Sequence, residues 1–312
     1  MKPRVLVIGS INMDLVVRVD RMPREGETII GREFQTFPGG KGANQAVACA
    51  RLGAQTFMAG RLGADSFGDA LLENLRKDGI DTAHIARDPS ASSGTAMIVV
   101  DKSGQNSIVV APGANMRMKP SDADALDELI RRVNCVVLQL ETPLEVVARA
   151  LDLAQKAGVK SILDAGPAVK CPMSILKKAD VVSPNEVEAQ TLIGKKITTV
   201  DSAKRVAKSF LSAGVKALAL KLGANGSVVA TKDKLLHVPA VEVKAVDTTA
   251  AGDAFTGALA LALAEGNEWL AAMRYANYAG AFAVTKPGAQ PSMPTRAELQ
   301  DFMSKNKLAA AK

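Results

Sequence analysis

Short apolar runs rich in β-forming residues alternate along the chain with longer stretches of helical pattern. The apolar runs cover residues 5–8, 135–140, 161–164, 181–183 and 217–221. The helical patterns cover residues 44–52, 66–78, 121–132, 143–157, 202–212 and 253–264. Alternation of this kind is typical of an α/β protein whose parallel sheet is covered by helices on both faces. In such sheets ligands bind beyond the carboxyl ends of the strands, and the candidate motifs follow strands or begin helices.

Two segments break this alternation. Residues 16–37 mix Val, Ile and Phe with Gly, Pro and charged residues and show no helical period. Residues 94–111 contain two β-rich runs, 95–100 and 107–110, separated by a polar turn, which is a hairpin pattern. Together they predict a small antiparallel sheet outside the main layer. It is either a decoration of the sheet edge or a lid that excludes water during a transfer reaction.

Composition narrows the class of protein. A chain of 312 residues suits one large domain, or one domain plus a small one. A net charge of +7 is compatible with an anionic substrate or cofactor, but such a charge is more often a solubility feature. We find no zinc-finger spacing, no basic aromatic sheet motif and no long Lys/Arg run, so we do not expect nucleic-acid binding.

The three cysteines, Cys49, Cys135 and Cys171, are far apart and suggest neither a disulfide framework nor a metal cluster. This usage favours a reducing compartment, so we expect a cytoplasmic protein. The apolar run at 5–8 is too short for a secretory signal, and no segment approaches the length needed to span a bilayer, so no membrane association is expected.

The most informative segment is 246–255, where an acidic residue follows a run of small ones. Ala250, Ala251 and Gly252 predict a tight turn that leads into a helix, with Asp253 in or beside its first turn. Free backbone N–H groups and the helix dipole attract anions such as phosphate there. A carboxylate beside such an anion hole is suited to take a proton from a hydroxyl that attacks a phosphoryl group. Alternatively, Asp253 is only a helix cap.

Two motifs near the N-terminus offer polar groups for a sugar. Asn12 and Asp14 alternate with apolar residues, so an extended backbone points both side chains the same way, where they could bind adjacent hydroxyls or make turn bonds. The loop 38–44 is Gly-rich but matches neither a P-loop nor a dinucleotide fingerprint. Its glycines permit close approach to a ligand beside Lys41 and Asn44, or merely form a flexible connection.

Three further strand ends carry candidate polar residues. Glu141 follows the 135–140 run and is either a ligand group or a solvated carboxylate. Asn185 and Glu188 share one face of a helical first turn, which suits either Mg²⁺ held through water or a capping box. The glycines of residues 220–227 could cradle a nucleotide or turn a hairpin.

Four of these motifs and a fifth near the C-terminus, taken in order, resemble the ribokinase family of carbohydrate kinases, which includes B-type phosphofructokinase-like proteins. The motifs are residues 12–14, 39–44, 185–188, 247–253 and 288–292. The resemblance extends over essentially the whole chain. It implies a ribokinase-like three-layer α/β sandwich with a mostly parallel central sheet and a small β-sheet lid. The implied α/β domain covers residues 1–14, 39–93 and 112–312, and the implied lid, through which a homodimer would form, covers 15–38 and 94–111.

The resemblance further implies ATP-dependent phosphorylation of D-ribose at O5, giving ribose 5-phosphate and ADP. Asn12 beside Asp14 favours a sugar with a full set of hydroxyls, because a buried amide without its partner is costly. The alternatives are a kinase for 2-deoxyribose, another sugar or a nucleoside, and a non-catalytic sugar-binding regulator on the same fold. A dinucleotide-dependent oxidoreductase would need a glycine fingerprint that the first strand lacks.

By position in the motifs, the resemblance assigns four groups of residues. Asp253 would be the general base, in an anion hole formed by Ala250, Ala251 and Gly252. The sugar would be held by Asn12, Asp14, Gly40, Lys41, Gly42, Ala43, Asn44 and Glu141. The nucleotide would contact Asn185, Lys221, Gly223, Ala224, Asn225, Gly226, Gly252, Asp253 and Asn277. Glu188 would support Mg²⁺ through water, and an activating K⁺ would be held by Asp247, Ser292 and the carbonyls of Thr249, Ala283, Lys286 and Gly288.

Overall fold

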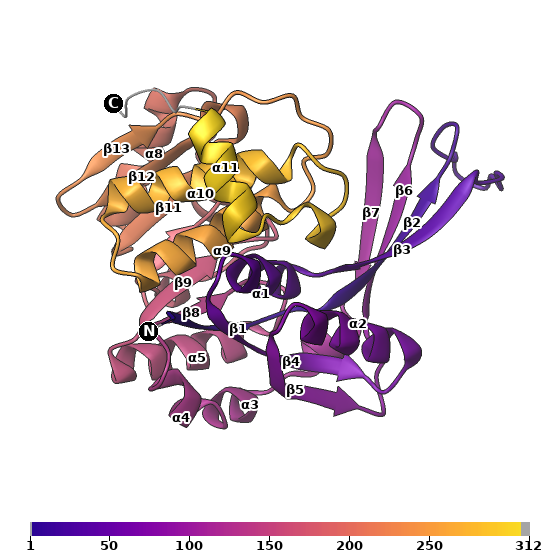
Figure 1. Cartoon of the computed structure of the whole chain (residues 1–312), viewed down its shortest axis with the longest axis horizontal. Helices are drawn as coiled ribbons and strands as arrows, with labels where there is room; N and C mark the ends of the chain where they lie inside the picture. Colours follow the sequence, from indigo (N-terminus) through magenta and orange to yellow (C-terminus); the bar gives the residue numbers. More distant parts are fainter. Residues whose placement is uncertain (1, 307–312) are drawn as a thin grey trace.

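The computed structural model describes residues 2–306, which form a nine-stranded sheet, a separate four-stranded sheet and the helices around them (Figure 1). The large sheet has the order β13-β12-β11-β10-β9-β8-β1-β4-β5. Its strands are β1 Arg4–Ile8, β4 Gln55–Gly63, β5 Asp81–Asp88, β8 Cys135–Leu138, β9 Lys160–Asp164, β10 Val181–Ser183, β11 Ala217–Lys221, β12 Ser227–Thr231 and β13 Leu235–Val238. All neighbours from β11 to β5 pair in parallel, and only β12 and β13 run antiparallel, so the predicted mostly parallel sheet is confirmed.

Helices cover both faces of this sheet, so its strands are buried on both sides. Val5 and Val7 of β1 lie in one core cluster, whereas Leu6 and Ile8 lie in the other. The first cluster is completed by α1 Lys41–Arg51, α2 Ser66–Lys77, α9 Ala251–Ala264, α10 Trp269–Ala283 and α11 Arg296–Lys305. The second is completed by α3 Pro120–Asp124, α4 Asp127–Ile130, α5 Leu144–Ala157, α6 Met173–Leu176, α7 Glu186–Ile193 and α8 Val200–Ser212. The predicted three-layer arrangement is therefore confirmed.

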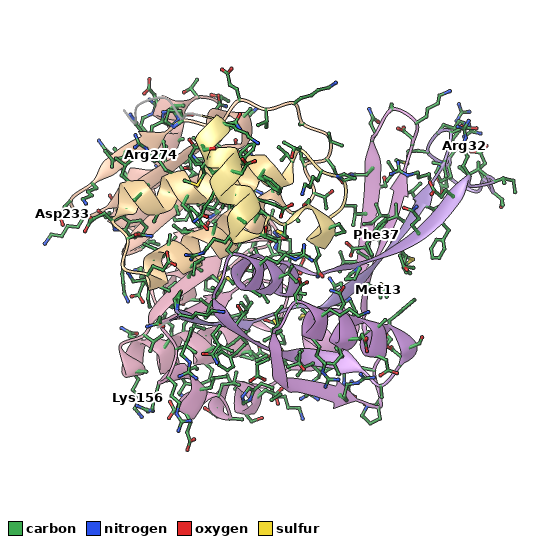
Figure 2. The ribbon with its side chains drawn as sticks, viewed as in Figure 1. Met13, Arg32, Phe37, Lys156, Asp233 and Arg274 are labelled. Carbon is green, nitrogen blue, oxygen red and sulfur yellow. The ribbon has the colours of Figure 1, made fainter. Side chains whose placement is uncertain are left out.

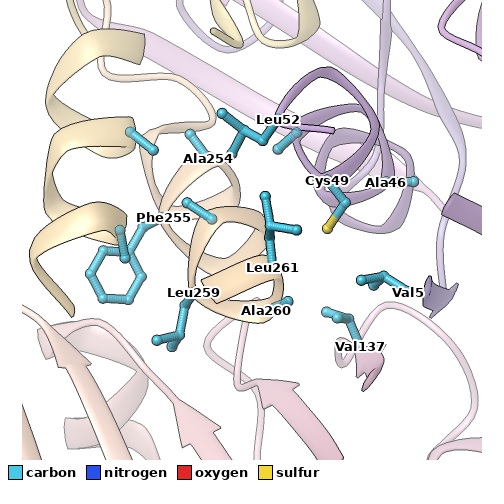
Figure 3. Packing of buried hydrophobic residues seen from close by; sticks show 14 of the residues in the cluster. Val5, Ala46, Cys49, Leu52, Val137, Ala254, Phe255, Leu259, Ala260 and Leu261 are labelled. Carbon is cyan, nitrogen blue, oxygen red and sulfur yellow. The ribbon is translucent and has the colours of Figure 1, made fainter. Parts of the chain in front are cut away.

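Helix α9 lies within the first core, next to α1 and α10 and over the strands (Figure 3). Its residues are buried without interruption from Asp253 to Leu263. Small residues let α1 approach it closely: a β-carbon placed on Gly257 would lie 2.6 Å from Cβ of Ala48. This close packing fixes the start of α9 relative to the start of α1.

The small sheet projects from the main body (Figure 1). It consists of β3 Glu33–Gly39, β2 Asn12–Arg18, β6 Gly94–Val100 and β7 Asn106–Ala111, in that spatial order. The β6–β7 hairpin is confirmed, and β2 pairs with β3 antiparallel and with β6 in parallel. Figure 2 shows Arg32 and Phe37 on this projecting part. Because β2 begins at Asn12, the predicted sugar-binding residues lie where the small sheet leaves the body.

Two predicted elements differ from the structure. The single helix expected at 121–132 is wrong: α3 and α4 are separate, and the turn between them buries Leu126 in the second core, beside Ile130 of α4. The strand expected at 135–140 ends at Leu138, since the N–H of Leu140 donates to the carbonyl of Gly166 instead of continuing the ladder. Three short 3₁₀ helices complete the connections, at Gly113–Arg117, Gly223–Asn225 and Gln290–Ser292.

Candidate active site

Asp253 occupies the first turn of α9, as predicted, and only 5% of its surface is exposed. Its carboxylate does not cap the helix. Instead Asn44 Nδ2 donates to Oδ2 at 2.9 Å, and Gln45 Nε2 donates to Oδ1 at 3.0 Å. The helix-cap alternative is therefore wrong, because both bonds come from α1 and aim the carboxylate between the two helix starts.

The turn before Asp253 has an unusual backbone. Ala250 adopts the left-handed conformation, with φ 59° and ψ 10°, which residues other than glycine rarely do. The helix begins directly afterwards at Ala251. The N–H of Ala251 donates weakly to the carbonyl of Thr248 at 3.4 Å and that of Asp253 donates to the carbonyl of Ala250 at 3.0 Å, so the N–H of Gly252 is the one left for a ligand in this turn. A β-carbon placed on Gly252 would lie 3.7 Å from Nζ of Lys221. The N–H of Gly252, the positive end of the helix dipole and an ammonium thus meet at this helix start, an arrangement suited to an anion.

The glycine-rich loop packs directly against the segment that follows β1. Gly40 has φ 87°, and a β-carbon there would lie 2.7 Å from the backbone nitrogen of Asn12. A β-carbon on Gly42 would lie 2.7 Å from the backbone nitrogen of Ser10, and Ala43 N–H donates to the Ser10 carbonyl at 2.9 Å. The loop is therefore a close backbone contact and not an open, flexible connection. It places the start of α1 beside Asn12.

Asn12 is 4% exposed and is fixed by a residue that sequence reasoning missed. Asn115 Nδ2 donates to Asn12 Oδ1 at 2.7 Å, while Asn115 Oδ1 accepts from the N–H of Ile11 at 3.0 Å. Asn115 is 1% exposed and lies in a 3₁₀ turn. Nothing in its local sequence points to this contact, because its partners lie more than a hundred positions away.

The charges of three predicted carboxylates, Asp253, Glu188 and Glu141, act on the ammonium group of Lys41. Lys41 Nζ is 3.9 Å from Asp253 Oδ1, and Glu141 Oε2 accepts from the N–H of Lys41 at 3.2 Å and from Ser10 Oγ. Burial raises the pKa of Asp14 to about 7, and the charges of Glu141 and Asp253 add to this effect. Burial also raises the pKa of Glu141, against the effect of Lys41.

Lys41 itself stays charged. Burial acts to lower its pKa, but the carboxylates of Asp253, Asp164, Glu188 and Glu141 outweigh burial and raise the pKa above its ordinary value. A permanently cationic side chain therefore balances part of the negative charge of the site.

Asp164, at the end of β9, is fully buried and was not predicted as a site residue. Its Oδ2 accepts from Lys221 Nζ at 2.8 Å, Thr256 Oγ1 at 2.7 Å and Gln45 Nε2 at 3.3 Å. Burial opposes its ionisation, but the cations of Lys221 and Lys41 hold its pKa below the ordinary value. Its position at the carboxyl end of a predicted parallel strand is the one signal that could have suggested it.

Asn185 and Glu188 form the capping box of α7. Asn185 Oδ1 accepts from the N–H of Glu188 at 2.9 Å, and Glu188 Oε2 accepts from the N–H of Asn185 at 2.7 Å. Glu188 is 4% exposed, and burial raises its pKa against the opposing charge of Lys221. Its Oε1 lies toward Gly166, beside the end of the Lys41 side chain. Within residues 2–306 no group of three or more His, Cys, Asp or Glu could hold a metal by itself.

The glycine-containing turn at 223–226 joins β11 to β12, so the hairpin alternative is confirmed. Gly223, Ala224 and Asn225 are exposed, whereas Gly226 is buried with φ 83°. A β-carbon on Gly226 would collide with residues 238–240. Asn277 of α10 holds the same segment: its Nδ2 donates to the carbonyls of Val238 at 3.1 Å and Pro239 at 3.0 Å. Gly226 and Asn277 thus both pack against the segment 238–240.

The residues predicted for K⁺ lie around the connection that leads to α9. Asp247 accepts from the N–H groups of Thr249 and Gly288, both at 2.9 Å, and these bonds hold its pKa below the ordinary value against partial burial. Ser292 Oγ donates to the carbonyl of Ala289 at 2.8 Å, and the carbonyl of Ala283 accepts from the N–H of Lys286 at 3.2 Å. Asp247 thus connects the segment before α9 with the segment after α10.

The structure therefore arranges the predicted residues in three groups. The sugar group, at the starts of β2 and α1, meets Asp253. The nucleotide group, at the ends of β10 and β11, reaches Asp253 through the Lys221, Asp164 and Gln45 side chains. The group around Asp247 lies in the connection just before the start of α9.

A buried carboxylate at a helix start, beside polar groups from several strand ends, is an arrangement suited to taking a proton next to a bound anion. Comparison with known proteins agrees: the model of the pfkB family carbohydrate kinases matches residues 2–296. The chain is 40% identical over 303 residues to a ribokinase of Haemophilus influenzae, covering 97% of this chain and 99% of that one. It is 38% identical over 303 residues to a deoxyribokinase of Salmonella typhi, with the same coverage.

Among solved structures, that of Arabidopsis thaliana ribokinase complexed with ribose and ATP superposes with a TM-score of 0.90. It is 35% identical and covers 97% of this chain and 99% of its own. The chain belongs to the pfkB family of carbohydrate kinases. The expected fold and the expected enzyme class are confirmed. None of the helices within residues 2–306 combines the length and apolarity needed to cross a membrane.

Proposed function

We propose that the protein transfers the γ-phosphoryl group of ATP to O5 of D-ribose, giving ribose 5-phosphate and ADP. The single observation that carries this proposal is the buried Asp253 carboxylate, held by Asn44 and Gln45 at the start of α9. The near-complete coverage and 40% identity of a ribokinase support ribose as the acceptor. The match to a ribokinase that was solved with ribose and ATP supports both substrates.

The chain's own residues provide position and charge, which is most of what phosphoryl transfer requires. Asp253 takes the proton of the attacking hydroxyl as the new O–P bond forms. The N–H of Gly252 holds the negative charge of the transferred group at the helix start. The amides of Asn44 and Gln45 keep the Asp253 carboxylate aimed at that position.

The sugar-binding role of the first group is supported by an unpaired polar atom. Asn44 Oδ1 is buried and has no hydrogen-bond partner among the described residues, so it offers an acceptor to a ligand hydroxyl. Asp14 and Glu141 add carboxylate acceptors, and Gly40 brings the backbone close to Asn12. Together with Lys41, Gly42 and Ala43, these residues form the proposed sugar pocket.

2-Deoxyribose is the second candidate acceptor, because a deoxyribokinase is 38% identical over 97% of the chain. Initial rates with Mg·ATP and ribose, 2-deoxyribose, fructose or adenosine decide between them. We expect the highest kcat/KM with ribose. A higher value for any of the other three contradicts the ribose assignment, and no turnover with any of them supports a sugar-binding regulator.

We assign the nucleotide to the ends of β10 and β11, where Asn185, Lys221, Asn277 and the 223–226 turn provide the walls. Mg²⁺ fits beside Glu188, whose buried carboxylate faces two lysines and offers an oxygen to a metal-bound water. Bound there, the ion neutralises phosphate charge. In the capping box only Oε2 of Glu188 accepts a bond, from the N–H of Asn185. The other oxygen, Oε1, is therefore left to accept from a metal-bound water.

We assign K⁺ to the group around Asp247, where an ionised carboxylate, the Ser292 hydroxyl and the carbonyls of Thr249, Ala283, Lys286 and Gly288 provide only oxygen donors. A cation there would hold the segment that leads into Ala250. Turnover of ribose with K⁺, Na⁺ or choline as the sole monovalent cation tests this, with the highest kcat expected in K⁺. Equal rates in all three contradict the assignment.

We propose that the small sheet is a lid, covering residues 15–38 and 94–111, and that two copies pair through it. Large apolar side chains are exposed on three of its strands: Phe34 of β3, Met97 of β6 and Ile108, Val109 and Val110 of β7. A monomer rarely exposes such a set without a partner surface. The free, buried thiols of Cys49, Cys135 and Cys171 support a reducing compartment such as the cytoplasm.

A further inference from the structure

Asp164 is the most deeply buried charge in the site, and the proton transfer described above does not use it. It is fully buried, and it accepts four hydrogen bonds: from the N–H of Gly166 at 3.0 Å and from Lys221, Thr256 and Gln45. Three of these bonds end on Oδ2 and one ends on Oδ1, so both oxygens of the buried carboxylate are held in place and the groups that bind it are held too.

The side chain of Lys221, at the end of β11, extends past β10 to reach the Asp164 carboxylate at the end of β9. Strand β10 lies between β9, which carries Asp164, and β11, which ends at Lys221. The two side chains nevertheless meet at 2.8 Å, with the Lys221 side chain 10% exposed and that of Asp164 0% exposed. The bond pulls the ammonium away from the open end of β11 and toward the start of α9, where Nζ would be 3.7 Å from a β-carbon on Gly252.

We infer that Lys221 is a catalytic cation that contacts the transferred phosphoryl group at the start of α9, and that Asp164 is the positioning residue that holds it there. The inference rests on the proposed kinase function and deepens it, since it gives Lys221 a role in the chemical step beyond lining the nucleotide site. It also assigns a role to Asp164.

The arrangement suits this role better than that of a purely structural ion pair. A buried pair alone gains little over apolar residues of the same size, because both charges lose their hydration. Here Asp164 is fully enclosed, whereas Lys221 keeps some exposure beside the start of α9, near the N–H of Gly252. An ammonium placed in advance beside that N–H group costs no reorganisation when negative charge develops.

Asp164 also connects the cation to the general base. The same amide nitrogen, Gln45 Nε2, donates to Asp164 Oδ2 and to Asp253 Oδ1. Gln45 is fully buried, and its Oε1 accepts from Gln139 Nε2 at 2.8 Å, so the amide has no freedom to turn. Through its bonds to Gln45 and Lys221, the Asp164 carboxylate therefore fixes the position of Asp253 relative to Lys221.

The step balances without further reactants. The O5 oxygen forms a bond to the γ-phosphorus while the bond from that phosphorus to the β–γ bridging oxygen breaks. The bridging oxygen leaves with the electron pair as part of ADP, and the O5 proton passes to Asp253. Lys221 transfers nothing and stabilises the charge on the moving phosphoryl group.

The test compares Asp164→Asn, Lys221→Met and the double variant in the full-length protein. We expect Lys221→Met to lower kcat with ribose and Mg·ATP by about 10²–10³-fold, the usual effect of losing one such donor. Asp164→Asn should lower kcat by about tenfold or more, while the KM for ribose stays within about threefold, since the sugar pocket is untouched. Each single variant leaves one buried charge without its partner, so both should melt below the unmodified protein.

The double variant separates chemistry from structure. It removes both charges, so its melting temperature should recover toward that of the unmodified protein, while its kcat stays at the level of Lys221→Met. Recovery of kcat together with melting temperature shows a structural pair only and overturns the inference. An unchanged kcat in Asp164→Asn overturns it as well.

Thr256→Val is the matched control, because it removes one hydrogen bond to the same Asp164 oxygen without changing charge. We expect its loss of kcat to be clearly smaller than that of Asp164→Asn; an equal loss would show that packing around Asp164, not its charge, matters. The proposed function is tested separately, by turnover of the unmodified protein. If the unmodified protein phosphorylates no sugar, that proposal is refuted independently of these variants.

Discussion

Asp253 is held by neutral donors, while the nearest ammonium stays farther away. The amides of Asn44 and Gln45 lie at 2.9 and 3.0 Å, whereas Lys41 Nζ lies at 3.9 Å. The two amides fix the direction of the carboxylate, while the ammonium lies beyond hydrogen-bond distance. The residue is thus both fixed in direction and available to a proton.

Substitution of this carboxylate should separate binding from turnover. We expect Asp253→Asn to keep the fold and ribose binding but to lower kcat by about 10²–10⁴-fold, the range for removing a positioned general base. Ribose binding is measured by calorimetry and kcat by ADP release. A near-normal kcat in this variant would refute the assignment of Asp253.

The raised pKa of Asp14 predicts a pH dependence of sugar capture. Burial, Glu141 and Asp253 raise this pKa to about 7, so below that pH the carboxyl holds a proton and is a poorer acceptor for sugar hydroxyls. We expect kcat/KM for ribose to rise by about tenfold per pH unit below pH 7 and then to level off. In Asp14→Asn this rise of kcat/KM below pH 7 should disappear. If the rise persists, it is caused by the titration of another group.

How far single residues could be predicted depended on where their partners lie. Asp253 was predictable because its own neighbours, Ala250 to Gly252, reveal an anion-binding turn. Gln45 was not, since its bonds to Asp253 and Asp164 span 208 and 119 positions. The local sequence does not show which residues so far apart in the chain come into contact. These contacts arise only when α1 packs against α9.

At the scale of elements, the turn before α9 carries backbone strain at a position of proposed function. Ala250 is the only residue other than glycine with positive φ within residues 2–306. For alanine the left-handed region costs about 1–2 kcal/mol. The strain is tolerated because the buried length of α9 holds the helix start in place.

Two substitutions at Ala250 should have opposite consequences. Ala250→Gly relieves the strain, so we expect unfolding in urea at an equal or higher midpoint. Ala250→Val adds a β-branched side chain at positive φ, so we expect a loss of about 2 kcal/mol in the free energy of unfolding and a lower kcat. If both variants unfold like the unmodified protein, the left-handed turn is wrong.

Elements were predictable where burial alone determines the pattern. Strands β9, β10 and β11 follow from short apolar runs, because both of their faces are covered. Strands β4 and β5 were missed, since β4 contains glycines and an arginine, and most residues of the edge strand β5 are partly or fully exposed. The hydrophobic spacing of 121–132 continues through the turn between α3 and α4, which hides the break.

At the scale of the whole molecule, the projecting small sheet is the part least covered by its own chain (Figure 1). Every residue of β7 is exposed, although three of them are large and apolar. Pairing of two such sheets would remove this surface from water.

Substitutions on β7 test the pairing. We expect the unmodified protein to sediment as a dimer and the Ile108→Glu/Val109→Glu variant, which places a charge on each face of the strand, to sediment as a monomer. Ser107→Glu is the control, because it adds the same charge at an already polar exposed position of β7 and should leave the dimer intact. A monomeric unmodified protein would contradict the proposal.

The groups that meet at the start of α9 come from strand ends and helices spread from Asn12 to Asp253. During synthesis the sugar-facing half therefore emerges from the ribosome long before the helix that carries the base. A nascent chain that ends before Asp253 can contain the proposed sugar-binding residues but lacks the proposed general base. Such an incomplete product should therefore transfer no phosphoryl group, even where it binds the sugar.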